Sequence, residues 1–156
     1  MRFKPLTFII CIAIPLLVGG LAAFLTSDSM ELFEAMNQPP LSPPGILFPI
    51  VWSILYTLMG IASYLVITSG NPSGEIQAAM MVYGIQLLFN FLWSIIFFNL
   101  EWYWFAFIWL LMLWALIYLT KHLFSMISKT AGYLMVPYLL WVAFAGYLNF
   151  GIAILN

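Results

Sequence analysis

Five long apolar stretches occupy most of the chain, over residues 6–25, 46–67, 76–98, 102–120 and 131–155. Each has close to the ~20 residues that an α-helix needs to cross the ~30 Å hydrocarbon layer of a bilayer. Asp, Glu, Lys and Arg are absent from the central part of every stretch. The pattern predicts an all-α protein, an integral membrane bundle of five transmembrane helices that forms one domain over residues 1–156.

The segments between the stretches carry signals that end a helix. Residues 39–45 (PPLSPPG) are rich in proline, which lacks the backbone N–H that a helix interior needs. We expect residues 39–45 to form a stiff, extended surface segment, and residues 27–45, the first connection, to form a lid loop over the bundle. Residues 69–74 (SGNPSG) predict a turn, and residues 121–129 a frayed helix end. The first stretch also fits a signal peptide with a cleavage site near Ala22, but its length favours a retained helix.

The charged residues predict how the bundle is oriented. The Lys and Arg residues fall on the side of the N-terminus, and most acidic residues fall opposite: Arg2, Lys4, Lys121 and Lys129 against Asp28, Glu31, Glu34 and Glu101. Because basic loops stay on the cytoplasmic side, we expect the N-terminus inside and the C-terminus outside, in a bacterial cell membrane. The net charge of −1 gives no indication of a nucleic-acid partner.

Composition narrows the possible functions. Hydrophobic residues make up 65% of the chain and charged residues 6%, which excludes a soluble globular protein. Proton relays, ion-coupled transporters and hydrolases usually need ionisable side chains at membrane depth, so this sequence argues against them and leaves a transporter without ion coupling as one alternative. Cys11 and His122 are the single Cys and His. We find no metal-ligand spacing and predict no metal site.

Bulky and polar side chains gather in the half of the predicted bundle that lies near the first connection. Trp52 and Tyr56 are four residues apart and share one helix face, and Asn90 and Trp141 fall at a similar depth in other stretches. Indole N–H groups, an amide and aromatic faces suit a large, flat, apolar ligand. We therefore predict a binding pocket there. Close helix packing through small and polar residues is the alternative explanation.

Three motifs resemble those of a known family. They are residues 49–66 (PIVWSILYTLMGIASYLV) with the Pro-rich segment before them, residues 88–94 (LFNFLWS), and residues 137–149 (PYLLWVAFAGYLN). Together they resemble the tryptophan-rich sensory protein / translocator protein family, which includes the mitochondrial peripheral benzodiazepine receptor. The resemblance covers nearly the whole chain, with a matching number of spans.

The resemblance implies a five-helix bundle, usually a homodimer, with a ligand pocket under the first connection and no required cofactor. Ligands in the family include porphyrins such as protoporphyrin IX, haem, cholesterol and isoquinoline carboxamides. By resemblance, the ligand-facing polar groups are on Trp52, Asn90 and Trp141, the walls are Tyr56, Trp93, Ala145, Leu148 and Gly19, and the lid includes Pro43.

This chain departs from the family pattern in the lid and at the C-terminus. Leu41 stands where the family commonly has Trp, and Gln38 where it frequently has Lys. No basic residue follows Tyr147, so the C-terminal cholesterol motif is missing and we do not predict cholesterol binding. The resemblance implies two functions. One is a receptor that binds porphyrins for sensing, handling or transport; the other is light- and oxygen-dependent breakdown of bound protoporphyrin IX, with Trp52 and Trp141 as candidate catalytic residues.

Overall fold

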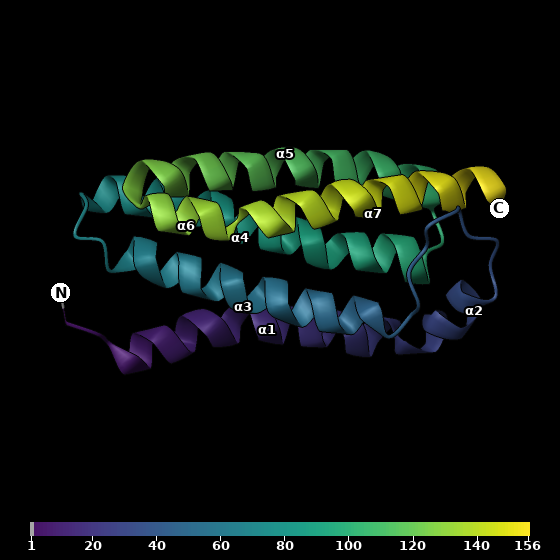
Figure 1. Ribbon diagram of the computed structural model, residues 1–156, viewed down its shortest axis with the longest axis horizontal. Coiled ribbons are helices and arrows are strands. Elements are labelled where there is room, and N and C mark those ends of the chain that lie inside the picture. The colour runs from purple at the N-terminus through teal and green to yellow at the C-terminus, as the bar shows by residue number, and fades with distance from the viewer. Residues whose placement is uncertain (1) are drawn as a thin grey trace.

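The computed structural model describes residues 2–156, and within them it confirms an all-helical bundle (Figure 1). Five helical segments in this range are long and apolar enough to span a membrane. The long helices run side by side, and the N- and C-termini lie at opposite ends (Figure 1). Their bounds are α1 (Pro5–Thr26), α3 (Leu47–Ile67), α4 (Ser73–Ser94), α5 (Tyr103–Ile127) and α7 (Val136–Leu155).

Two helix ends differ from the sequence prediction. The fourth span does not fray after residue 120, because α5 continues to Ile127. The predicted last span, residues 131–155, is divided into the short helix α6 (Lys129–Leu134) and α7. Ser128 separates α5 from α6 with an extended backbone, and its hydroxyl accepts a hydrogen bond from the backbone N–H of Ala131 at 3.2 Å. This side-chain cap starts α6 at Lys129, slightly before residue 131, where the last span was predicted to begin.

The first connection, predicted as a lid loop over residues 27–45, is helical over residues 27–34. The chain leaves α1 through the single turn η1 (Ser27–Ser29) and the short helix α2 (Met30–Glu34). The Pro-rich part that follows is extended and lies against the C-terminal end of α7. There Tyr147 donates its hydroxyl to the carbonyl oxygen of Pro40 at 2.6 Å, and Asn156 donates its amide to the carbonyl oxygen of Asn37 at 2.8 Å.

Helices α1 and α3 approach closely near the N-terminal end of the bundle. A Cβ on Gly60 of α3 would lie 2.6 Å from the Cα of Ile12 on α1, which is closer than side chains tolerate. Small residues allow this backbone contact between membrane helices. On the outside of the bundle, large apolar side chains such as Leu17 and Phe24 are 71% and 75% exposed. An exposed apolar surface of this kind belongs in lipid.

Helix α4 ends in a wider turn. Its last residues continue as the π-helical segment η2 (Ile95–Asn99), and such turns often occur at functional sites. The wider turn places the neighbouring residues Phe97 and Phe98 on one internal cavity, which is described below. The turn therefore changes which side chains the end of α4 presents to the interior.

Candidate ligand-binding site

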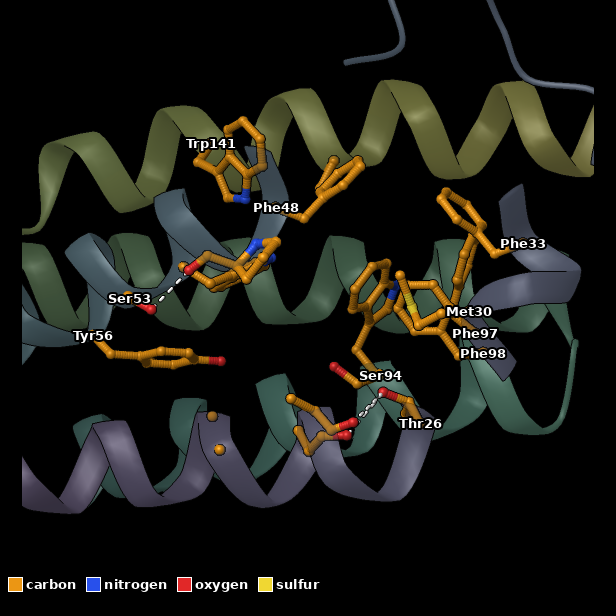
Figure 2. A pocket seen from close by; sticks show the side chains of 18 of the residues that line it. Thr26, Met30, Phe33, Phe48, Ser53, Tyr56, Ser94, Phe97, Phe98 and Trp141 are labelled. Carbon is orange, nitrogen blue, oxygen red and sulfur yellow. Dashed lines mark hydrogen bonds between the residues drawn. The ribbon is translucent and has the colours of Figure 1, made fainter. Parts of the chain in front are cut away.

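A cavity of about 380 Å³ lies between α1, α3, α4 and α7 (Figure 2). It is in the half of the bundle that holds the C-terminus and the first connection (Figure 1). Its volume is near the lower end of the range of about 300–1,000 Å³ that is usual for small-molecule sites. Among the described residues that line it, none is Asp, Glu, Lys, Arg or His. The surface is made of aromatic rings, aliphatic and small side chains, and a few hydroxyl and amide groups.

Trp52 lies at the centre of the aromatic side chains of the cavity. Its ring stacks on Tyr56, one turn further along α3, with centroids 5.5 Å apart and an interplanar angle of 26°. It meets Trp141 of α7 edge to face at 6.5 Å and 87°. Phe48 also contacts Trp141, at 5.9 Å. Residues spaced by four on a helix share a face, so the sequence pattern places Trp52 and Tyr56 together, whereas their contact with α7 arises from the fold.

Trp141 carries a polar group that the protein does not satisfy. Its indole Nε1 is buried and has no hydrogen-bond partner within residues 2–156. Figure 2 shows this nitrogen pointing from α7 toward the cavity. A buried donor without a partner costs about 1–3 kcal/mol. The N–H is therefore available to an acceptor on a ligand.

Asn90 lies behind the wall of the cavity and is not part of its lining. It is 1% exposed, and both ends of its amide are used. The Tyr56 hydroxyl donates to Asn90 Oδ1 at 3.1 Å, and Asn90 Nδ2 donates to the hydroxyl of Tyr138 at 2.6 Å. Tyr138 in turn donates to Gln86 Oε1 at 2.7 Å. The amide that was expected to face a ligand instead fixes the position of Tyr56.

Trp93 contributes its ring to the cavity but not its N–H. Its indole Nε1 donates to Oδ1 of Asn149 at 3.1 Å, and Nδ2 of Asn149 donates to the carbonyl oxygen of Tyr103 at 2.9 Å. The Trp93 ring stacks on Phe97 at 5.2 Å and 22°. Asn149, on α7, thus ties the end of α4 to the start of α5 and holds Trp93 as an apolar wall.

The remaining predicted residues divide between the lining and the outside. Gly19, Ala145 and Leu148 line the cavity as the resemblance implied. At Gly19 a side chain would overlap the Tyr56 ring, so a glycine is needed for this close approach. Pro43 is absent from the described lining. The reason is that the Pro-rich segment is held against α7, where Pro39 would be 2.5 Å from a Cβ on Gly151.

The end of the cavity nearest the first connection is formed by residues that sequence reasoning missed. They are Met30, Phe33, Phe48, Phe97 and Phe98, most of which Figure 2 shows clustered at one end of the cavity. Residues 27–45 were predicted only as a lid loop, which gave no indication of the short helix α2 that directs Met30 and Phe33 inward. Phe97 and Phe98 stood at the end of a predicted span, where aromatic residues usually indicate the membrane interface; the π-helical turn redirects them.

Comparison with known proteins identifies the chain. A model of the TspO/MBR family matches residues 11–155. The chain belongs to the TspO/MBR family. It is 38% identical to the tryptophan-rich protein TspO of Chlorobaculum tepidum over 100% of this chain and 99% of that protein. It is 34% identical to the tryptophan-rich sensory protein of Cereibacter sphaeroides over 97% and 90% of the two chains.

The family extends to animals. The translocator protein of Bos taurus is 32% identical to this chain over 88% of it and 82% of the bovine protein. Family membership confirms the resemblance drawn from the three sequence motifs. Together with the five apolar helices, it shows that this TspO/MBR member is an integral, multi-pass membrane protein.

Proposed function

We propose that this TspO/MBR member is a membrane receptor that binds porphyrins, such as protoporphyrin IX or haem, in the cavity between α1, α3, α4 and α7. The observation that carries the proposal is the unpartnered indole N–H of Trp141 on a cavity of aromatic rings without a charged lining residue among those described. Flat aromatic walls stack on a macrocycle, and the indole N–H can donate to the π face or a ring nitrogen of the macrocycle.

The absence of Lys and Arg from the described lining constrains how a porphyrin binds. Its carboxylates would be costly to bury unpaired, so we expect the macrocycle inside and the carboxylates toward the membrane surface. Such a mode uses stacking and shape more than ion pairing. It suits a protein for sensing, handling or transport of tetrapyrroles, which needs to bind and release its ligand.

A dark titration of the purified protein with protoporphyrin IX, followed by the absorbance of the porphyrin, tests the proposal. We expect saturable 1:1 binding. Trp141→Phe keeps an aromatic ring but removes the donor, and should weaken binding by about 0.5–1.5 kcal/mol, the net value of a typical hydrogen bond. Trp102→Phe is the matched control, because Trp102 is 56% exposed and outside the cavity lining. Equal affinities for both variants would contradict the role of Trp141, and no saturable binding would overturn the function.

A second candidate function is light- and oxygen-dependent degradation of the bound porphyrin. It is favoured by the edge-to-face pair of Trp52 and Trp141 at 6.5 Å, both on the cavity, because indole rings are oxidisable and would lie beside the pigment. The pigment itself would supply the photochemistry. Illumination of the complex should then give a new absorbing product that is lost in Trp52→Phe; bleaching at the same rate without a new product would leave binding as the function.

We also propose that the N-terminal end of the bundle faces the cytoplasm. Lys4 precedes α1, Lys121 lies near the end of α5 and Lys129 starts α6, and these helix ends lie at the same end of the bundle as the N-terminus (Figure 1). The positive-inside rule supports this orientation for a bacterial cell membrane. Labelling of cysteines introduced at positions 4 and 156 from one side of sealed vesicles would test it. The homodimer implied by the resemblance stays a prediction.

A further inference from the structure

The cavity is closed at the end that faces the first connection. Phe33 is 9% exposed, and its ring makes edge-to-face contacts with Phe48, Phe97 and Phe98 at centroid distances of 6.2, 5.9 and 5.3 Å. Beyond these rings, hydrogen bonds from α7 hold the Pro-rich part of the first connection in place. A ligand that arrived from this end would have to displace several packed aromatic side chains.

The side of the cavity between α1 and α3 is open. On α1, one stripe of lining residues with the spacing i, i+4, i+7 is exposed; on α3, a pair with the spacing i, i+4 is exposed as well. We call these five residues the side mouth: Leu16, Gly20, Ala23, Pro49 and Ser53. A Cβ on Gly20 would have no neighbour within 4 Å. The side mouth therefore has free space at Gly20, near its centre.

The surface around the side mouth is apolar. Leu17 and Leu21 of α1 are 71% and 52% exposed, and Ile50 and Ile54 of α3 are 50% and 55% exposed. The hydroxyl of Ser53 is satisfied by the backbone oxygen of Pro49 at 2.7 Å, as the dashed line in Figure 2 marks. Exposed apolar side chains and satisfied polar groups are what a surface in contact with acyl chains requires. The side mouth thus opens toward lipid.

We propose that the ligand enters and leaves the cavity through the side mouth, from the bilayer leaflet next to the first connection. The proposal rests on the binding function proposed for the same cavity. It makes the natural ligand an apolar, membrane-dissolved molecule with a flat ring system, which diffuses laterally between α1 and α3. The first connection then acts as a fixed end wall while the ligand exchanges.

This route has a kinetic signature. A larger side chain in the side mouth obstructs a step that the ligand crosses in both directions, so it slows association and dissociation by the same factor and leaves Kd unchanged. A larger side chain in a wall of the cavity acts differently, because it changes the stability of the bound state. Rates and affinity measured together therefore distinguish the side mouth from a wall.

The test uses Gly20→Leu in the full chain, reconstituted in lipid vesicles, with protoporphyrin IX transferred from donor vesicles and its rates followed by stopped-flow fluorescence. Gly84→Leu is the matched control. Gly84 of α4 is also exposed, a Cβ there would also have no neighbour within 4 Å, and it does not line the cavity. For Gly20→Leu we expect both rate constants to fall on the order of tenfold, which corresponds to a barrier raised by ~1.4 kcal/mol. Gly84→Leu should match the unmodified protein.

A second measurement fixes the first connection in place. In the structure, the side chain of Asn156 is hydrogen-bonded to the backbone of Asn37. Both residues are changed to cysteine, Asn37→Cys and Asn156→Cys, and the two thiols are joined with a short bifunctional reagent. If the ligand passes through the side mouth, its association and dissociation rates should be unchanged after cross-linking. Ligand association and dissociation rates that stay normal in Gly20→Leu would contradict entry through the side mouth, and so would a cross-link that stops ligand exchange. Either result would leave the binding function intact. If the unmodified protein shows no saturable binding, the binding function itself fails.

Discussion

Removal of the Tyr138 hydroxyl tests the buried polar chain beneath the cavity. Tyr138 is fully buried, accepts a hydrogen bond from Asn90 at 2.6 Å and donates one to Gln86 at 2.7 Å. Tyr138→Phe leaves Nδ2 of Asn90 and Oε1 of Gln86 without these partners. In water-soluble proteins each such group costs about 1–3 kcal/mol. Measured values between membrane helices average ~0.6 and reach ~1.7 kcal/mol per bond, so the loss of two bonds should lower the free energy of unfolding by about 1–3 kcal/mol.

The assay is reversible unfolding in mixed micelles with increasing denaturing detergent, read by circular dichroism. Tyr118→Phe is the control, because Tyr118 is 52% exposed on α5 and its loss of a hydroxyl should change the free energy by less than about 0.5 kcal/mol. Adding Gln86→Met to Tyr138→Phe should cost less than the sum of the two single changes, because the second substitution removes a group that the first left unpaired. Equal stability of Tyr138→Phe and Tyr118→Phe would refute the reasoning.

Two glycines give further predictions. Gly19→Ala places a Cβ against the Tyr56 ring, so it should weaken porphyrin binding on the order of tenfold through an overpacked wall; in a titration, an affinity equal to that of Gly84→Ala would contradict this. Gly60→Ala places a Cβ 2.6 Å from the Cα of Ile12 and should separate α1 from α3 at a cost of about 1–3 kcal/mol. Detergent unfolding of Gly60→Ala checks the value, and a midpoint equal to that of the unmodified protein would argue against the close approach.

The five spans could be predicted from sequence because a helix in lipid depends on local properties. A run of apolar residues of sufficient length forms its backbone hydrogen bonds within itself, and proline and glycine mark its ends. The length of α5 was underestimated because Lys121 and His122 reduce hydropathy without interrupting the helix. Cationic side chains near a span end extend to the interface, and so permit the helix to continue.

The site could be predicted only where helix periodicity determines it. Trp52 and Tyr56 face the cavity together because of their spacing on α3. The position of Asn90 could not be predicted in the same way, because its partners Tyr56 and Tyr138 lie on two other helices. Phe33 was missed since its direction depends on a short helical turn in the first connection. Contacts between helices, rather than the pattern along any one of them, decide these positions.

The hydrogen-bond chain beneath the cavity has a direction, and that direction determines what Tyr56 can offer a ligand. Each donor along it points away from Tyr56: Tyr56 to Asn90, Asn90 to Tyr138, Tyr138 to Gln86. The hydroxyl hydrogen of Tyr56 is already engaged in the hydrogen bond to Asn90, so its oxygen can accept a hydrogen bond from a ligand but cannot donate one. Trp141, on the facing helix, offers a hydrogen but no lone pair. The two sides of the cavity thus offer a ligand different hydrogen-bonding groups, an acceptor on α3 and a donor on α7, so the two faces of a bound ring system are not equivalent.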